Sequence, residues 1–245
     1  MINAYQTFFD HGKAIYKGEV LTNAPDGHTK IRVHLVFDVK HDGRHKARLV
    51  AGGHLTGEPV ESVYSSVVSL RSLRIVTFLN ELNQLELWGA DVGNAYLEAY
   101  TDENVFIIAG GEFGDRKGHI LIIKRALYGL KTSGKRWHER LASCMEELGF
   151  SRCQADQDVW MRPAKDKSCY EYVACYVDDL LISMKDPKEF CELLKTKFNF
   201  KLKGDGPIDY HLGLNYIRDP DGTLVLQPKK YLKKIMESYK NMFGE

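Results

Sequence analysis

The sequence has no long hydrophobic run, no paired-cysteine motif and almost no net charge. None of its apolar stretches is long enough to span a bilayer, and its first residues do not form a signal peptide. The five cysteines are odd in number and lack a Cys-x-x-Cys pair, so we expect reduced thiols in an intracellular protein. The nine histidines are scattered without the paired His and Cys spacing of a zinc site. These absences argue against a membrane protein, a disulfide scaffold and a zinc-binding domain.

The composition is that of an ordinary globular protein. A hydrophobic fraction of 44% with 27% charged residues is usual for a soluble domain, and 245 residues suffice for one large domain or two lobes. The formal net charge of +1 does not by itself predict a nucleic-acid partner. Only a local cluster of basic residues can do so.

Residues 31–50 carry such a cluster on a predicted β-hairpin. Apolar residues alternate from Ile31 to Val39, an Asp-Gly turn signal follows at residues 42–43, and a second strand continues through Lys46 and Arg48. Basic residues outnumber acids across the hairpin. A solvated surface is the usual explanation of such a run, and contact with phosphate groups is the sharper alternative.

The remaining elements follow from periodicity and cap signals. We expect four helices: one over 70–82, one from residue 133 or 134 to 148, one after Asp186-Pro187 and one after Pro228. We expect further strands at 85–92, 105–108, 119–124, 214–217 and 223–227. Ser69 is the predicted N-cap of the first helix, and Gly149 follows the second. The order of strands and helices predicts an α+β fold with the helices on one face of a sheet.

Residues 172–183 join two apolar, β-branched runs through two adjacent aspartates. This pattern predicts a buried hairpin whose tip carries Asp178 and Asp179. Two carboxylates in a buried setting repel each other and lose hydration. A divalent cation relieves both costs, and carboxylate oxygens suit Mg²⁺. The alternative is a surface turn with two solvated acids, which the apolar flanks disfavour.

A third acid, Asp91, lies at the end of the predicted strand 85–92. Phosphoryl transfer by two metal ions needs at least two carboxylates, which separate strands can supply. Because residues of a strand alternate between its faces, we expect unequal roles for the adjacent aspartates. We expect Asp178 to bridge the two ions and Asp179 to support it.

Five motifs together resemble those of reverse transcriptases from copia-type LTR retrotransposons. Tyr-Val-Asp-Asp at 176–179 resembles the signature of reverse transcriptases, and residues 91–96 resemble their other acidic motif. Residues 46–50, 127–131 and 210–213 are similar to motifs of the copia-type branch. The five occur in the family's order within residues 31–242, which makes the set far more specific than the tetrad alone.

The resemblance implies the fold of a right-hand polymerase. It has an antiparallel palm sheet backed by helices, a fingers subdomain with a β-hairpin, and a truncated thumb. Matching the motifs divides the chain into fingers at 1–66 and 101–133, palm at 67–100 and 134–226, and the start of a thumb at 227–245.

The resemblance also assigns the site residue by residue. Asp91, Asp178 and Asp179 would be the catalytic, metal-binding carboxylates, with the backbone carbonyl of Val92 as a further ligand. The expected cofactor is a pair of Mg²⁺ ions, with Mn²⁺ as a substitute. The expected nucleotide-binding residues are Lys46, Arg48, Tyr96, Tyr128 and Gly129, and the expected primer-binding residues are Tyr176, Leu212 and Gly213. The ring of Tyr96 would exclude a 2′-hydroxyl group, so selection of deoxynucleotides would depend on a clash.

The implied function is RNA-directed DNA polymerisation, in which a deoxynucleotide from a deoxynucleoside triphosphate is added to the 3′-hydroxyl of a primer. The expected partners are an RNA or DNA template with its primer, and the RNase H and integrase regions of a parent Pol polyprotein. The expected location is a retrotransposon particle in the cytoplasm. Because the sequence ends soon after the expected thumb begins, we expect a fragment of a longer polyprotein or a decayed copy.

Three alternatives come from other classes of protein. Residues 129–136 nearly fit a P-loop, although Arg136 stands where Ser or Thr is needed to hold Mg²⁺. A P-loop ATPase would depend on Lys135 rather than Asp178. A nucleotide cyclase also uses two acids but needs neither Tyr96 nor a basic hairpin. A truncated, inactive remnant would bind nucleic acid without extending a primer.

Overall fold

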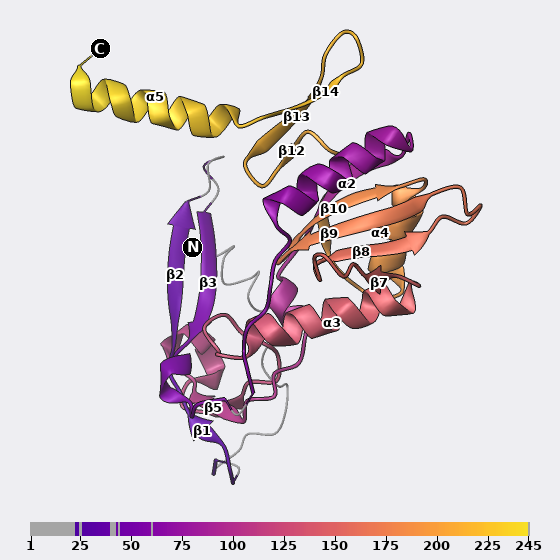
Figure 1. Ribbon diagram of the computed structural model, residues 1–245. Coiled ribbons are helices and arrows are strands. Elements are labelled where there is room, and N and C mark those ends of the chain that lie inside the picture. Colours follow the sequence, from indigo (N-terminus) through magenta and orange to yellow (C-terminus); the bar gives the residue numbers. More distant parts are fainter. Residues whose placement is uncertain (1–22, 25, 40–42, 44, 60, 245) are drawn as a thin grey trace. The chain divides into compact units, whose positions relative to one another are not determined.

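The computed structural model describes residues 23–244 except 25, 40–42, 44 and 60 (Figure 1). The predicted turn residue Asp42 therefore lies outside the described residues. The chain divides into two compact units that alternate along the sequence. The first unit comprises residues 1–65 and 94–143, and the second comprises 66–93 and 144–245. No helix in the described ranges combines the length and the apolar character needed to cross a membrane. The division into fingers, palm and thumb stays a prediction.

The first unit is built around small sheets. Strands β2 (Val33–Val39) and β3 (His45–Ala51) pair antiparallel, which confirms the predicted hairpin. Strand β5 (Val105–Ile108) pairs with β1 (Thr29–Lys30) in parallel and with β6 (Ile120–Ile122) antiparallel. The short 3-10 helices are η1 (Gly53–Leu55), η2 (Ala95–Glu98) and η3 (Gly111–Arg116). Ile31, Leu49, Ile107 and Leu127 belong to one buried cluster that joins these strands.

The second unit contains an antiparallel sheet of six described strands, in the order β11-β4-β10-β9-β8-β7 (Figure 1). The strands are β4 (Glu86–Val92), β7 (Ser151–Arg152), β8 (Val159–Pro163), β9 (Tyr170–Tyr176), β10 (Asp179–Met184) and β11 (Leu202–Pro207). A smaller sheet joins β12 (Tyr210–His211), β13 (Leu214–Arg218) and β14 (Leu224–Gln227). The predicted class, α+β with an antiparallel sheet, is what the structure has.

The helices begin where the cap signals predict. The Ser69 hydroxyl accepts a hydrogen bond from the Ser72 N–H at the start of α2 (Leu70–Leu82). The Asp186 carboxylate caps α4 (Pro187–Thr196), which has its proline in the first turn. The other helices are α3 (Ser133–Glu147) and α5 (Lys229–Phe243), which is the last element.

The prediction that helices cover one face of the sheet is wrong, because both faces are covered. On one face of β10, Leu181 belongs to the same buried cluster as Val76 of α2, and the Ser183 hydroxyl donates to Asn80 of α2 at 2.9 Å. The alternate residues Leu180 and Ile182 are also fully buried on the other face. Figure 1 shows α2 and α4 on opposite sides of this sheet.

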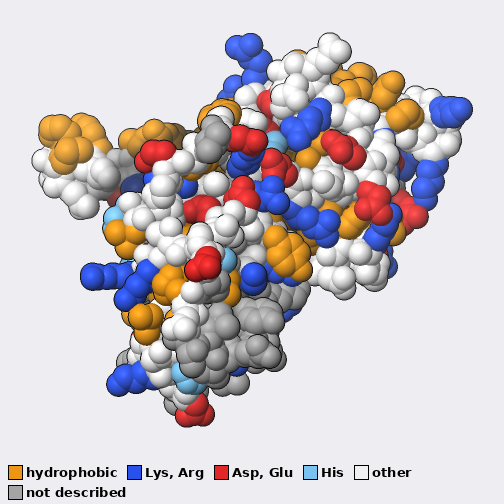
Figure 2. All heavy atoms as spheres, turned by 90° about the horizontal axis from the view of Figure 1, so that it is seen from below, with side chains coloured by type: hydrophobic (Ala, Val, Ile, Leu, Met, Phe, Trp, Pro, Cys, Tyr) orange, Lys and Arg blue, Asp and Glu red, His pale blue; other side chains and the backbone are white. Residues whose placement is uncertain are grey.

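On the face seen in Figure 2, charges of one sign do not gather into one large patch. Figure 2 shows acidic and basic side chains interspersed over the face seen there, in keeping with the formal net charge of +1. Hydrophobic side chains gather on α5, at the left of that view. The large apolar residues that α5 exposes are Tyr231, Leu232, Ile235, Met236, Tyr239, Met242 and Phe243.

Candidate active site

Asp91 and Asp179 lie directly opposite each other on the neighbouring strands β4 and β10. The two acids belong to a row of neighbouring residues that runs across four strands. Tyr176 of β9 lies opposite Asp179, and Lys203 of β11 lies opposite Asp91. Residues directly opposite in antiparallel strands project from the same face of a sheet. Four strands therefore present one aromatic ring, two carboxylates and one ammonium group side by side.

Asp178 lies in the turn between β9 and β10, immediately before Asp179. Its backbone carbonyl accepts a hydrogen bond from the Val92 N–H at 2.8 Å, which fixes the turn against the end of β4. Val177, the other turn residue, has a φ of 55°. Two-residue hairpin turns require a positive φ at their first central position, and a β-branched residue adopts it only with strain. The turn that carries Asp178 is thus both strained and held in place.

The three carboxylates influence one another. Burial and, to a smaller extent, the negative charges of Asp178 and Asp91 together raise the pKa of Asp179 to about 6. An acid whose ionised form is destabilised in this way is a candidate for a functional site. This end of the sheet therefore accumulates negative charge that a bound cation would stabilise.

Lys203 is a further residue at this end of the sheet, and patterns in the sequence do not predict its place there. Its side chain lies over Gly93, where an added Cβ would be 2.9 Å from its Cε and 3.1 Å from its Nζ. Gly93 is thus the residue that leaves room for this lysine beside the acidic end. The strand that carries Lys203 has the sequence Leu-Lys-Gly-Asp-Gly-Pro. Because glycine and proline are rare in strands, no local signal pointed to β11 or to Lys203.

The chemical type of the donor atoms at this end of the sheet suits a hard divalent cation. Carboxylate oxygens and a backbone carbonyl are the ligands that Mg²⁺ and Mn²⁺ prefer. Within the part of the chain that the structure describes, however, no three His, Cys, Asp or Glu side chains are arranged so that they could hold a metal ion together. The acids share one end of the sheet, and a bound ion would have to draw their carboxylates closer than the structure has them.

The predicted nucleotide-binding residues all lie in the first unit. Lys46 and Arg48 are two residues apart on β3, so they share one face of the hairpin, and the Arg48 guanidinium lies 3.6 Å from the Asp38 carboxylate. The rings of Tyr96 and Tyr128 pack together in a tilted pair, with centroids 4.8 Å apart. The structure thus brings these residues together in two pairs.

Gly129 ties the loop at 127–131 to the end of the β2–β3 hairpin. The Ala51 N–H donates to the Tyr128 carbonyl at 2.6 Å, and Gly129 has a φ of +91°. A Cβ at Gly129 would lie 2.1 Å from the Ala51 carbonyl oxygen, and one at Gly53 would lie 2.1 Å from the Gly129 carbonyl oxygen. Two glycines are therefore required where these backbones cross.

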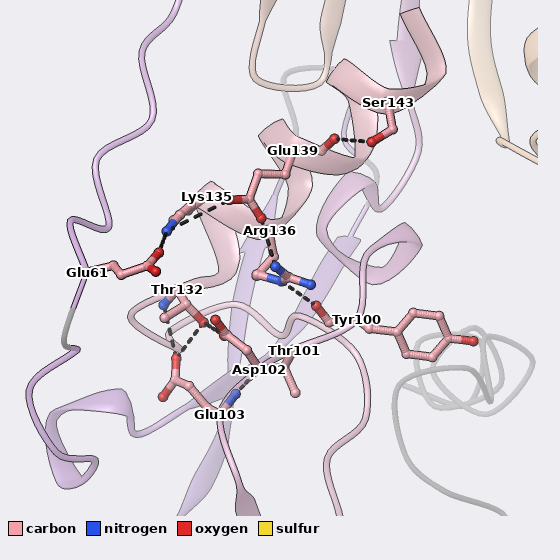
Figure 3. Close-up of polar contacts among 10 residues, drawn as sticks. All are labelled: Glu61, Tyr100, Thr101, Asp102, Glu103, Thr132, Lys135, Arg136, Glu139 and Ser143. Atoms are coloured by element: carbon pink, nitrogen blue, oxygen red, sulfur yellow. Dashed lines mark hydrogen bonds and ion pairs between the residues drawn. The ribbon is translucent and has the colours of Figure 1, made fainter. Parts of the chain in front are cut away.

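A polar network holds the same loop at the start of α3, as Figure 3 shows. The Thr132 hydroxyl lies 2.7 Å from the Asp102 carboxylate and 3.0 Å from the Glu103 carboxylate, which share its single proton, and the Thr132 N–H also donates to Glu103. The Arg136 guanidinium binds the Tyr100 carbonyl at 3.2 Å and the Glu139 carboxylate at 2.8 Å. These contacts fix the loop from two directions.

The P-loop alternative does not fit this geometry. Lys135 lies in the first turn of α3 and pairs with the carboxylates of Glu61 and Glu139 (Figure 3). In a P-loop the equivalent lysine reaches the nucleotide phosphates, and the loop follows a strand directly. Here β6 ends at Ile122, well before Gly129. Lys135 is therefore accounted for by ion pairs at the surface of the first unit.

The predicted primer-binding residues lie in the second unit, as the acids do. Leu212 and Gly213 form the turn between β12 and β13, with φ angles of 46° and 90°, as in a type I′ turn. Leu212 packs against the buried cluster that contains Leu181 of β10. The Arg218 guanidinium of β13 binds both carboxylate oxygens of Glu81 on α2 at 2.7 Å, so this small sheet is tied to α2.

Comparison with known protein families identifies the class of this protein. The family described as reverse transcriptase (RNA-dependent DNA polymerase) matches residues 16–243, which is most of the chain. The chain belongs to this family.

Its relatives narrow the class to the copia-type branch. The chain is 28% identical over 231 residues to the Retrovirus-related Pol polyprotein from transposon TNT 1-94 of Nicotiana tabacum, covering 89% of this chain and 17% of the relative. It is 29% identical over 198 residues to the corresponding polyprotein from transposon RE1 of Arabidopsis thaliana, covering 79% of this chain and 13% of that protein. It is 28% identical over 213 residues to the Transposon Ty1-DR1 Gag-Pol polyprotein of Saccharomyces cerevisiae, and this match covers 82% of this chain and 11% of the yeast protein. The predicted resemblance is confirmed, and the chain spans less than a fifth of the length of these relatives.

Proposed function

We propose that this chain is the RNA-directed DNA polymerase part of a copia-type Pol polyprotein. The observation that carries the proposal is the direct opposition of Asp91 and Asp179, with Asp178 in the adjoining turn. Family membership supports the reaction class, and the clustered acids support this end of the sheet as its location. The RNase H and integrase regions of the same polyprotein would be its partners, and a cytoplasmic retrotransposon particle would be its location.

The proposed reaction transfers a nucleotide to the 3′-hydroxyl of a primer. The primer oxygen gives up its proton to solvent and forms a bond to the α-phosphorus of the triphosphate, while the bond from that phosphorus to the bridging oxygen breaks and pyrophosphate leaves. Two Mg²⁺ ions, when bound, would supply activation of the primer hydroxyl and neutralisation of the developing charge. Asp91, Asp178 and Asp179 would hold them, together with the Val92 carbonyl.

The first unit would bind the incoming nucleotide. Lys46 and Arg48 are suited to contact its phosphates because they share one face of β3. The ion pair between Arg48 and Asp38 is long, and the Asp38 carboxylate is exposed, so the pair would be exchanged for a phosphate at little cost. The Tyr96 ring is packed on Tyr128, and this limits its freedom to move away from a 2′-hydroxyl group. We therefore propose that Tyr96 selects the sugar.

The second unit would hold the primer end. Tyr176 lies next to Asp179 in the row of side chains across the sheet and is 39% exposed. The tight turn at Leu212 and Gly213 is anchored through Leu212 in a buried cluster. An anchored turn and an exposed ring in the same unit as the acids are suitable contacts for a primer strand.

Primer extension on an RNA template with Mg²⁺ or Mn²⁺ tests the proposal. We expect the unchanged chain to extend the primer, Asp178→Asn to lose extension by at least about 100-fold because a ligand charge is removed, and Asp221→Asn to extend normally. Asp221 is a matched control because it is also an aspartate in a hairpin turn of the second unit, and its carboxylate accepts only a local hydrogen bond from Thr223.

Two results would contradict this proposal in different ways. Equal extension by Asp178→Asn and the unchanged chain would show that the acids are wrongly assigned. Tight binding of a primer–template without extension by the unchanged chain would favour the alternative, an inactive nucleic-acid-binding remnant.

A further inference from the structure

Helix α2 buries one side against the sheet and exposes an apolar stripe on its other side. Leu73, Val76, Thr77 and Asn80 are buried at helical spacing against the second unit. The opposite stripe is exposed, with Phe78 and Leu82 each at 65%. A helix that needs only to cover a sheet has a polar outer face. The apolar outer stripe of α2 therefore needs a separate explanation.

Two arginines flank this stripe. Arg71 and Arg74 are three residues apart, so they lie on the same side of the helix as Phe78. Together with Leu70 and Ile75 they line a hollow of about 320 Å³, and no acid lines it. Among the described residues neither guanidinium has a hydrogen-bond or ion-pair partner. The acid of α2, Glu81, is already bound by Arg218.

The outer stripe starts beside the acidic end of the sheet. The Val68 N–H donates to the Cys175 carbonyl at 3.0 Å, so the residues that lead into α2 are attached to β9 just before Tyr176. The helix lies on the face of β10 from which Leu181 and Asp179 project, since alternate residues of a strand share a face. In the second unit, α2 thus extends away from Asp179 on the same side of the sheet.

We propose that this face of α2, formed by Leu70, Arg71, Arg74, Ile75 and Phe78, binds an unpaired stretch of a nucleic-acid strand. The guanidinium groups match the negative charge of two phosphates, and the exposed ring offers a surface on which a base stacks. A purely apolar partner would leave two arginines unpaired, so a polyanion with aromatic bases fits this face better than a neutral helix does. The inference rests on the proposed function, because it supplies the strand that reaches the acids.

Binding of a labelled single-stranded RNA oligonucleotide to the full chain, followed by fluorescence anisotropy, tests this inference. We expect the double substitution Arg71→Gln and Arg74→Gln to weaken binding at least tenfold. The slope of log affinity against log salt should become shallower by about 0.7 for each phosphate that the variant no longer neutralises. The matched control, Lys167→Gln with Lys188→Gln, removes two exposed charges elsewhere in the second unit and should change both quantities much less.

A substitution at Phe78 distinguishes base stacking from simple apolar contact. Phe78→Leu keeps an apolar side chain but removes the ring, so it should weaken RNA binding by about fivefold or more, as loss of one stacked base does. A thermal unfolding midpoint like that of the unchanged chain would show that each variant is folded. A polypeptide partner would tolerate leucine at this position much better than a base would.

Several results would overturn the inference. RNA binding by the α2 variants equal to that of the lysine control would do so, as would equal displacement of the RNA by polyglutamate, which would indicate a general surface for anions or proteins. If the chain extends a primer normally but the α2 variants bind RNA as well as the unchanged chain does, this inference fails and the proposed function stands. If RNA binding depends on α2 but the chain does not extend a primer, the proposed function fails and this inference stands.

Discussion

Asp91 and Asp179 lie opposite each other on adjacent strands of one sheet, and both carry a carboxylate on the same face. Like charges in this position destabilise an antiparallel pair. Burial adds a desolvation cost for Asp179, whose pKa is raised to about 6. Folding alone gives no reason for such a pair, whereas cation binding does. We therefore expect that removing one of these carboxylates makes the metal-free chain more stable and weakens its binding of a divalent cation.

The first prediction concerns Asp179→Asn. Without divalent cations at pH 7, this substitution should raise the free energy of unfolding by about 0.5–1 kcal/mol, because it removes one of two opposed charges. Mg²⁺ should raise the unfolding midpoint of the unchanged chain and have a smaller effect on the variant. Both values can be measured by thermal unfolding with EDTA or Mg²⁺. A variant less stable than the unchanged chain in EDTA would contradict the repulsion argument.

The second prediction concerns the turn residue Val177. Its φ of 55° is strained for a β-branched residue, so Val177→Gly should relieve about 1 kcal/mol of strain. Glycine would also free the turn that carries Asp178, so primer extension should fall although stability does not. Denaturant unfolding and extension assays measure the two effects.

Lys167 is the matched control for Val177. It has a φ of 58° in the turn at the other end of β9, and its side chain is exposed. Lys167→Gly should relieve similar strain and leave extension unchanged. If both glycine variants extend the primer normally, the strain at Val177 has no role in positioning Asp178.

Local signals in the sequence were enough to predict the helices and the hairpins. Ser69 and Asp186 cap α2 and α4 as expected, because capping depends on residues within one turn. The pattern of two apolar runs around adjacent aspartates predicts a hairpin, and the structure confirms it. These features involve only neighbours in the sequence.

Features that depend on distant residues were harder to predict. Lys203 lies opposite Asp91 on β11, the neighbour of β4 on the side away from β10. Strand β11 is rich in glycine, so local sequence patterns do not predict that it is a strand. The covering of both sheet faces does have a signal in the sequence. Residues 180–184 form an almost continuous apolar run, whereas a strand covered on one face alone usually alternates apolar and polar residues.

The third prediction concerns the crossing of two backbones in the first unit. Gly129→Ala should destabilise the chain by about 2 kcal/mol or more, since a Cβ there would lie 2.1 Å from the Ala51 carbonyl oxygen and the φ is +91°. Gly118→Ala is the control, because Gly118 also has a positive φ and has no atom within 4 Å of its added Cβ. The difference between the two variants in denaturant unfolding measures the close approach. Equal effects would mean that the loop at 127–131 moves away from β3 without cost.

The last prediction concerns His211, which is 6% exposed in the small sheet that contains Leu212. Burial lowers the pKa of this imidazole from 6.5 to about 4. The unfolded chain therefore binds a proton below about pH 6.5 that the folded chain does not bind, so stability falls as the pH decreases from about 6.5 to about 4. The loss attributable to His211 is at most about 3.5 kcal/mol.

Unfolding by denaturant at several pH values between these limits measures this dependence. His211→Phe should flatten it, because phenylalanine has a similar volume and nothing to protonate, and in the described structure the buried Nε2 atom has no hydrogen-bond partner to lose. His34→Gln, at an exposed position of β2, should keep the dependence of the unchanged chain. If His211→Phe loses as much stability between pH 6.5 and pH 4 as the unchanged chain does, the acid sensitivity arises from other groups and His211 is not buried as a neutral imidazole.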